Sequence, residues 1–301
     1  MSSLRSWIVS FRLRTLPLAL ACVGMGTILA IDYRIFNWKI FGLTVLTAIF
    51  LQVLSNLAND YGDTVKGTDN ENRLGPQRAL QSGEISLKAM QNAIVIFATL
   101  ALFSGIGLLT VAMEGQSSTM FIIFLLIGLS CITSAIKYTV GEKPYGYSGF
   151  GDIAVFIFFG LVGVGGTFYL YAHSLPTIIL LPASALGFLS AGVLNINNMR
   201  DIDNDAAAGK RTIVVRMGLA NAKKYHVVLI LMALVFLFLY TSARIISPLQ
   251  MLYLVVTPLF MIHLVSVLGK ESKAMDSNLK QLAIFTLILV ICFGLNIVLC
   301  A

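Results

Sequence analysis

The chain has 301 residues, of which 57% are hydrophobic and only 12% are charged, and its mean hydropathy is +0.87. Soluble domains contain about 25% charged residues, so this composition excludes an ordinary cytosolic enzyme, a disordered protein and a nucleic-acid-binding domain. The net charge of +7, from 21 Lys and Arg against 14 Asp and Glu, must therefore be interpreted relative to a membrane.

Residues 6–14 precede the first apolar run and combine Trp7, Ile8 and Phe11 with basic side chains. This mixture predicts a segment that lies in the membrane interface. Nine apolar runs follow, each close to the roughly 20 residues that a helix needs to cross the hydrocarbon core. They are 15–31, 40–60, 90–112, 119–138, 152–172, 176–197, 225–243, 249–269 and 281–300.

These runs are continuously apolar, whereas the strands of a membrane barrel alternate apolar and polar residues. The longest gap between them, residues 61–89, leaves no room for a soluble domain. We therefore predict one all-α membrane domain over residues 1–301.

Lys and Arg are distributed unequally between the two sides of the predicted membrane protein. Eighteen of the 21 fall on the side that holds the N-terminus, and the other side holds only Arg34, Lys39 and Arg244. Because cytoplasmic connections carry the excess of positive charge, we predict a cytoplasmic N-terminus.

Acidic residues gather where the second and sixth predicted helices reach the cytoplasmic side. Seven of the fourteen Asp and Glu fall in two short windows there. The windows read Asn56-x-x-Asn59-Asp60-Tyr61-x-Asp63, continuing through Asp69 and Glu71, and Asn197-Asn198-x-Arg200-Asp201-x-Asp203-x-Asp205.

If each helix continues through its window, Asp60 and Asp63 share one face, as do Asp201 and Asp205. Like charges at this spacing repel, and carboxylates near a low-dielectric region are costly to ionise. A divalent cation compensates for both effects, and Mg²⁺ binds carboxylates together with substrate phosphates. A solvated polar loop is the alternative for either window alone, but two matching windows favour a metal site.

Basic residues follow each acidic window. Arg73 and Arg78 bracket Gly75-Pro76, and Lys210-Arg211 follow the second window. Carboxylates that hold Mg²⁺, beside cations that hold phosphate oxygens, indicate a diphosphate site. The alternative for any single cation is the general positive charge of cytoplasmic connections.

The two windows resemble the aspartate-rich motifs of the UbiA-type intramembrane prenyltransferases, through Asn59-Asp60-x-x-Asp63 and Asp201-x-x-x-Asp205. The resemblance is strongest to the branch that prenylates 1,4-dihydroxy-2-naphthoate. Supporting stretches are Arg14-Thr-Leu-Pro17, Arg73-x-Gly75-Pro76-x-Arg78 and Ala208-Gly209-Lys210-x-Thr212, so that the resemblance runs from Arg14 to about Gly218. The chain departs from the broader family at Gly67, where that family has Asp; the next acid is Asp69.

The resemblance implies nine transmembrane helices around a central cavity, capped by Asp-rich cytoplasmic loops at about residues 56–89 and 197–220. It also implies transfer of a polyprenyl group from polyprenyl diphosphate to 1,4-dihydroxy-2-naphthoate. CO₂ and diphosphate are lost and demethylmenaquinol is formed. An allylic cation formed on the way must be kept from water and faced by apolar or aromatic walls.

The resemblance further implies a role for each site residue. Asp60, Asp63, Asp201 and Asp205 are expected to be the catalytic residues and Mg²⁺ ligands. The other expected contributors are Asn59 and Asn198 beside the metal, Arg78, Lys210 and Arg211 on the diphosphate, and Lys137 and Tyr138 on the aromatic acid. Independently of the resemblance, the need to shield the cation suggests Phe156, Phe158, Phe159 and Tyr169 as wall residues. Packing or contact with lipid is the favoured alternative for any one of these four.

The expected environment is the cytoplasmic (inner) membrane of a bacterium, with the site facing the cytoplasm and lipid as the surrounding partner. No nucleic-acid or protein partner is expected. Within the family, the alternative acceptors are 4-hydroxybenzoate and homogentisate. From another class, the alternative is a cation-coupled transporter, whose ionisable residues would lie near the membrane midplane and not at the interface.

Overall fold

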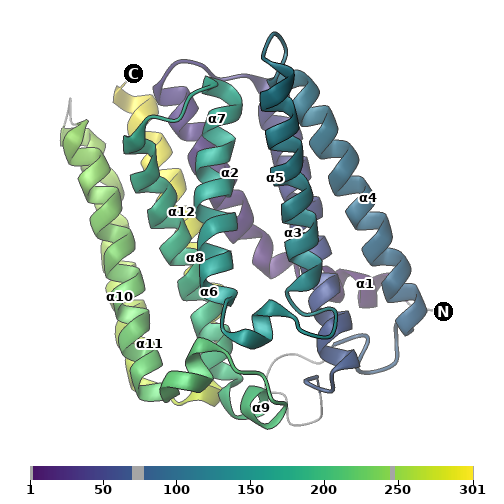
Figure 1. The fold of residues 1–301 in the computed structure, drawn as a ribbon. Coiled ribbons are helices and arrows are strands. Elements are labelled where there is room, and N and C mark those ends of the chain that lie inside the picture. Colours follow the sequence, from purple (N-terminus) through teal and green to yellow (C-terminus); the bar gives the residue numbers. More distant parts are fainter. Residues whose placement is uncertain (1–2, 70–77, 245–247, 301) are drawn as a thin grey trace.

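The computed structural model describes residues 3–69, 78–244 and 248–300. Over these residues the chain forms a helical bundle without strands. Nine helical stretches within the described ranges are long and apolar enough to cross a membrane, and they correspond to the nine predicted spans. Figure 1 shows the N- and C-termini at opposite ends of the bundle, as an odd number of crossings requires.

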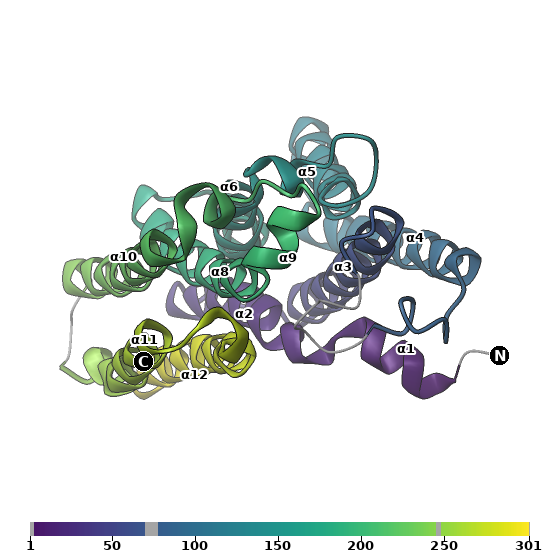
Figure 2. The same cartoon turned by 90° about the horizontal axis from the view of Figure 1, so that it is seen from below.

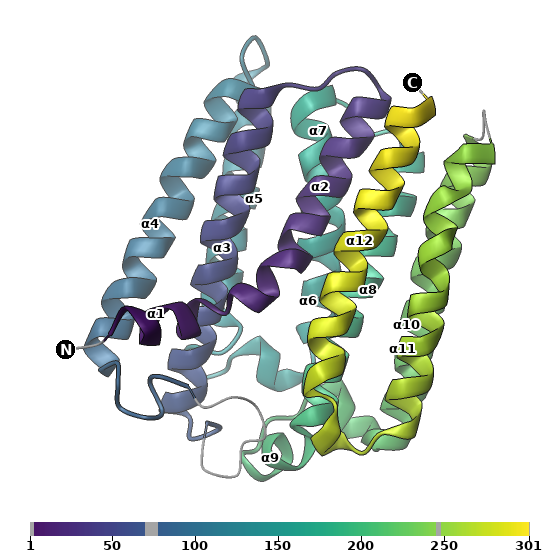
Figure 3. The same cartoon turned by 180° about the vertical axis from the view of Figure 1, so that it is seen from behind.

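The first helix, α1 (Leu4–Phe11), lies across one end of the bundle (Figure 3). Trp7 and Phe11 pack inward, whereas Leu4 and Ile8 are exposed. A short turn, η1 (Leu13–Thr15), joins α1 to α2 (Leu16–Asp32), which has Pro17 in its first turn. Proline is favoured there because its missing N–H group has no partner in the helix.

Three long helices follow: α3 (Trp38–Val65), α4 (Leu87–Ala112) and α5 (Ser118–Lys137). Each begins after a residue whose side chain accepts a hydrogen bond from the first turn, namely Asn37, Ser86 and Ser117. At 1.5 Å per residue α3 is about 42 Å long, so it extends beyond a hydrocarbon core of about 30 Å. The first acidic window was expected to be a loop from residue 56, but its Asp60 and Asp63 lie on the last turns of α3.

The fifth span combines α6 (Gly151–Val155), η3 (Phe156–Gly166) and α7 (Thr167–Ala172). The segment η3 is a π-helix, a rare form that is often found at functional sites. It packs against α8 (Leu180–Arg200). Short 3₁₀ turns precede these spans, at η2 (Tyr145–Ser148) and η4 (Thr177–Ile179).

The remaining elements are α9 (Ile202–Ala207), α10 (Ile213–Ala243), η5 (Pro248–Val256), α11 (Thr257–Gly269), η6 (Ser272–Ala274) and α12 (Asp276–Cys300). The second acidic window was also expected to be a loop from residue 197, but it lies mostly on α8 and α9. The backbone breaks between these helices at Asp201. Inside α10, Gly218 has a φ of 77°, which glycine adopts without the strain of a Cβ.

Two large hydrophobic clusters hold the bundle together. One includes Met25 of α2, Leu189 of α8, Ile230 of α10 and Leu282 of α12. The other joins α3 and α4, with Leu57 and Met90 fully buried. In the end-on view of Figure 2, α10, α11 and α12 lie on one side of the molecule and α3, α4 and α5 on the other.

Candidate active site

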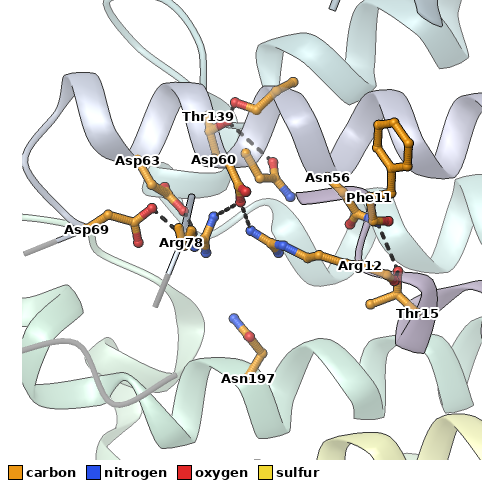
Figure 4. Close-up of polar contacts among 12 residues, drawn as sticks. Phe11, Arg12, Thr15, Asn56, Asp60, Asp63, Asp69, Arg78, Thr139 and Asn197 are labelled. Carbon is orange, nitrogen blue, oxygen red and sulfur yellow. Dashed lines mark hydrogen bonds and ion pairs between the residues drawn. The ribbon is translucent and has the colours of Figure 1, made fainter. Parts of the chain in front are cut away.

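The first acidic window forms a buried cluster of charges on the last turns of α3. Asp60 and Asp63 are only 1% and 6% exposed. Arg12 and Arg78 both donate to Oδ1 of Asp60 and approach it from two sides (Figure 4). The Arg78 guanidinium also lies 3.6 Å from Oδ2 of Asp63 and 3.1 Å from Oδ2 of Asp69. Because each carboxylate faces a guanidinium, the helix tolerates acids three residues apart.

Arg78 stays charged in this buried position. Burial alone would lower the pKa of its guanidinium, but Asp60, Asp69 and Asp63 raise that pKa above its ordinary value. Arg78 therefore lies beside the acidic residues, as the sequence predicted. The neighbouring Arg73 and Glu71, together with Gly75 and Pro76, lie outside the described residues.

Arg12 comes from the break between α1 and α2, 48 residues before its partner Asp60. Its φ of 49° lies in the left-handed region, which is uncommon for a residue other than glycine. The amide of Asn56 donates to the Phe11 carbonyl at 2.9 Å and to Thr15 Oγ1 at 3.0 Å, which holds this break against α3. Asn56 thus positions Arg12, a site residue that the sequence patterns did not indicate.

The second acidic window lies opposite the first, at the junction of α8 and α9. Arg200 contacts both oxygens of Asp201, from Nε at 2.9 Å and from Nη2 at 2.6 Å. Oδ1 of Asp205 forms an ion pair with Lys210 Nζ at 3.3 Å. Its other oxygen, Oδ2, is buried and has no hydrogen-bond partner among the residues that the structure describes.

The two windows are close enough to influence each other. Burial raises the pKa of Asp205 to about 6 against the opposing effect of Lys210, and the charges of Asp201 and Asp63 contribute to this rise. Lys210 is itself buried, which lowers the pKa of its amine, but Asp205 and Asp63 raise that pKa above its ordinary value. Carboxylates from both windows therefore share one electrostatic site.

Tyr147, in the turn between the fourth and fifth spans, connects the windows directly. Its hydroxyl donates to Oδ1 of Asp63 at 2.9 Å and lies 2.6 Å from Thr68 Oγ1. Lys210 Nζ lies 5.4 Å from the centre of its ring, a cation–π distance. A second connection runs from the Asn204 amide to the Thr68 carbonyl at 2.8 Å.

A cavity of about 410 Å³ extends from this charged site between the spanning helices. On α3 its lining runs from Asp63 to Thr44 at spacings of three and four residues, which at 1.5 Å per residue is about 28 Å. Phe158 and Phe159 of η3 line it as expected. The wall is otherwise mainly aliphatic, so the cavity is charged at one end and apolar along its length.

Two of the expected aromatic residues occupy other places. Phe156 packs against Phe188, with ring centroids 4.9 Å apart. Tyr169 stacks on Phe124 at 4.7 Å, and Phe124 is the residue that lines the cavity. Phe156 and Tyr169 therefore pack against other aromatic side chains, whereas Phe158 and Phe159 line the cavity.

The structure brings most of the predicted site residues together. Asn59, Asp63, Arg78, Tyr138 and Lys210 line the cavity. Asp60, Asp201 and Asp205 are buried beside it, each bound to a basic side chain.

Three predicted residues lie elsewhere. Lys137 and Arg211 are exposed and do not line the cavity. Asn198 is buried away from the cavity, and its neighbour Asn197 lines the cavity in its place. Figure 4 shows Asn197 projecting from α8 toward the space below Arg12 and Arg78.

The described side chains do not form a ready-made metal site: no three His, Cys, Asp or Glu among them converge on one point. The carboxylates instead contact guanidinium and ammonium groups. Within the described ranges, however, Asp205 has a buried oxygen without a hydrogen-bond partner, and such an oxygen, near Asp201 and Asp63, suits a hard cation. The aspartate oxygens therefore fit Mg²⁺, provided that the Arg and Lys side chains that contact them bind another anion instead.

Comparison with known proteins agrees with this geometry. The UbiA prenyltransferase family model matches residues 18–296, so the match extends well beyond Gly218, where the sequence motifs end. The chain is 41% identical over 297 residues to the 1,4-dihydroxy-2-naphthoate octaprenyltransferase of Haemophilus influenzae. This alignment covers 98% of the chain and 96% of the H. influenzae protein. The chain is 45% identical over 258 residues to the Escherichia coli protein of the same name, covering 86% and 83% of the two chains.

Solved structures show the same fold at low sequence identity. A UbiA homologue from Aeropyrum pernix superposes with a TM-score of 0.67 at 17% identity, over 96% of this chain and 98% of that one. A UbiA homologue from Archaeoglobus fulgidus, solved with GPP and Mg²⁺, gives a TM-score of 0.62 at 17% identity, over 96% and 99% of the two chains.

Proposed function

The chain belongs to the UbiA prenyltransferase family, and we propose that it transfers a polyprenyl group from polyprenyl diphosphate to 1,4-dihydroxy-2-naphthoate. One observation carries this proposal. A cavity that is charged at one end and apolar along its length lies in a chain whose relatives, matched over most of their length, are named for this reaction. The 4-hydroxybenzoate and homogentisate alternatives remain as arms of the test below.

In this reaction the bond between the allylic carbon and the diphosphate oxygen breaks, and the diphosphate leaves with the electron pair. The electron-rich ring carbon that bears the carboxylate forms the new carbon–carbon bond. Loss of CO₂ then returns the electrons to the ring, so that the products are demethylmenaquinol, CO₂ and diphosphate. The apolar body of the cavity keeps the allylic cation away from water.

We propose that Arg12, Arg78 and Lys210 hold the diphosphate, because their cationic groups border the charged end of the cavity. Asp60, Asp63, Asp201 and Asp205 are the proposed Mg²⁺ ligands, with Asn59 and Asn197 as neighbouring polar groups. Bound Mg²⁺ would neutralise the diphosphate oxygens as the bond breaks. Tyr138 lines the wall near Tyr145 and is the proposed neighbour of the aromatic acid.

The chain is an integral membrane protein, and the proposed location is the bacterial inner membrane with the charged end of the cavity facing the cytoplasm. Each substrate then reaches the site from the side that matches its polarity. The prenyl chain extends along the apolar cavity, and the water-soluble acid arrives at the charged end.

The test is a substrate panel with purified protein in detergent, Mg²⁺ and a polyprenyl diphosphate. We expect a prenylated naphthoquinol from 1,4-dihydroxy-2-naphthoate and no product after EDTA treatment. Product from 4-hydroxybenzoate or homogentisate, without product from the naphthoate, would overturn the assignment of the acceptor.

Variants separate the metal ligands from other acids. We expect Asp60→Asn and Asp201→Asn to abolish turnover while the proteins still insert and purify. Asp203→Asn is the matched control, because Asp203 lies in the same window but is exposed. Full activity in Asp60→Asn or Asp201→Asn would contradict the role given to that residue.

A further inference from the structure

Arg200 is among the largest fully buried side chains of the described structure, at 1% exposure. Four of the five N–H groups of its guanidinium are used. Nε and Nη2 bind the two oxygens of Asp201, Nη2 also donates to Asn197 Oδ1 at 3.0 Å, and Nη1 donates to Asp276 Oδ1 at 2.6 Å. One side chain therefore fixes a proposed metal ligand and a residue of the cavity wall.

Asp276 is the first residue of α12 and uses both of its carboxylate oxygens. Oδ1 accepts from Arg200, and Oδ2 lies 3.4 Å from Nη1 of Arg14 in η1. This carboxylate thus joins three segments that are far apart in the sequence: η1, which leads into α2, the end of α8 and the start of α12. It also gives a structural role to Arg14, which the proposed chemistry does not use.

We infer that Arg200 is a positioning residue for Asp201 and that Asp276 is the anchor that holds Arg200 in place. The inference rests on the proposed function, because Asp201 is there a ligand of Mg²⁺. A bidentate guanidinium holds the Asp201 carboxylate in one orientation, through Nε to Oδ1 and Nη2 to Oδ2. The last helix, α12, thereby controls the geometry of the second acidic window.

Two substitutions weaken this arrangement in different ways. Arg200→Lys keeps the charge but loses the fork that binds both oxygens of Asp201. Asp276→Asn leaves Arg200 and Asp201 intact and removes only the anchoring charge. Because Asp276 is partly exposed, its substitution is the milder of the two and tests the inference even if Arg200→Lys does not fold.

The experiment measures binding without turnover. Purified variants are titrated with Mg²⁺ in the presence of inorganic diphosphate, and the rise in Tm is followed as a function of Mg²⁺ concentration. We expect the half-saturating Mg²⁺ concentration to increase about 10- to 100-fold in Arg200→Lys and Asp276→Asn, the range found when residues behind a metal ligand are changed. Asp276→Glu should restore most of the affinity.

The control is Glu271→Gln, which removes an exposed acid from the turn before α12 and should titrate like the wild type. In turnover assays we expect Arg200→Lys and Asp276→Asn to need a higher Mg²⁺ concentration than the wild type for half-maximal rate, with the KM for the naphthoate unchanged. A purely structural role would lower the Tm without Mg²⁺ but leave the half-saturating concentration alone, and that result would overturn the inference. Absence of prenyl transfer by the wild type would instead contradict the proposed function, since the Tm titration does not depend on turnover.

Discussion

Lys210 and Arg211 are adjacent in the sequence but occupy opposite environments. Lys210 is buried against Asp205 and Tyr147, whereas the Arg211 side chain is exposed and only its backbone contributes, donating to the Tyr147 carbonyl at 2.9 Å. We predict that Lys210→Gln lowers kcat/KM about 10- to 100-fold, the value of a charge-assisted contact of about 1.5–3 kcal/mol. Arg211→Gln is the matched control and should stay within about threefold of the wild type. Equal losses in both variants would contradict a direct role for Lys210.

Tyr147 allows a second test at the scale of a single atom. Tyr147→Phe removes the hydroxyl that donates to Asp63 and costs about 1 kcal/mol, so we predict a roughly fivefold loss of kcat. Tyr61→Phe is the control, because its hydroxyl accepts from Gln91 on the side of α3 that faces α4. Steady-state kinetics of the two variants decide whether the contact with Asp63 matters.

Residue types and spacing predicted that the four aspartates and Lys210 lie close together, because acids are rare in this chain and their clustering is informative. The same patterns did not show which of Asn197 and Asn198 lines the cavity. Both lie in the second window, and only the face of α8 that is turned to the cavity distinguishes them. The patterns also missed Arg12, because its role depends on a left-handed backbone and on Asn56, 44 residues later. Local sequence carries no signal for either feature.

At the scale of helices, the contact between η3 and α8 depends on glycine. A Cβ at Gly160 would lie 2.6 Å from the Ala183 carbonyl oxygen and 2.7 Å from Gly187 Cα, and backbone atoms cannot move aside. We predict that Gly160→Ala lowers the stability by about 1–3 kcal/mol, the usual cost of overpacking. The measurement is the Tm of the purified protein in detergent.

Gly42 on α3 provides the control for this substitution. No atom lies within 4 Å of a Cβ placed there, and the position is exposed. Gly42→Ala should keep or raise the Tm, because alanine favours helix by up to about 1 kcal/mol. A drop of equal size in both variants would contradict the role of close packing at Gly160.

The nine spans were predictable because membrane helices need long apolar runs, and this chain has them without ambiguity. The ends of the helices were not. Residues 56–65 and 197–207 are polar enough to resemble loops, yet α3, α8 and α9 continue through most of them because buried basic partners neutralise their acids. The π-helix was equally hidden, since its composition is that of any apolar helix.

The distribution of positive charge predicts how the whole molecule is oriented in its membrane. Arg34, Lys39 and Arg244 lie where α2 and α10 end and α3 begins, and the acidic windows lie at the opposite end of α3. Lys39 and Lys66 are both exposed and are separated by about 40 Å along α3. In a background with the four cysteines replaced by alanine, we expect Lys39→Cys to react with a membrane-impermeant maleimide on intact cells. Lys66→Cys should react only in inverted vesicles, since 18 of the 21 basic residues belong on the cytoplasmic side. The reverse labelling pattern would place the site outside the cell, away from a cytoplasmic supply of the naphthoate and diphosphate substrates, and would overturn the proposed orientation.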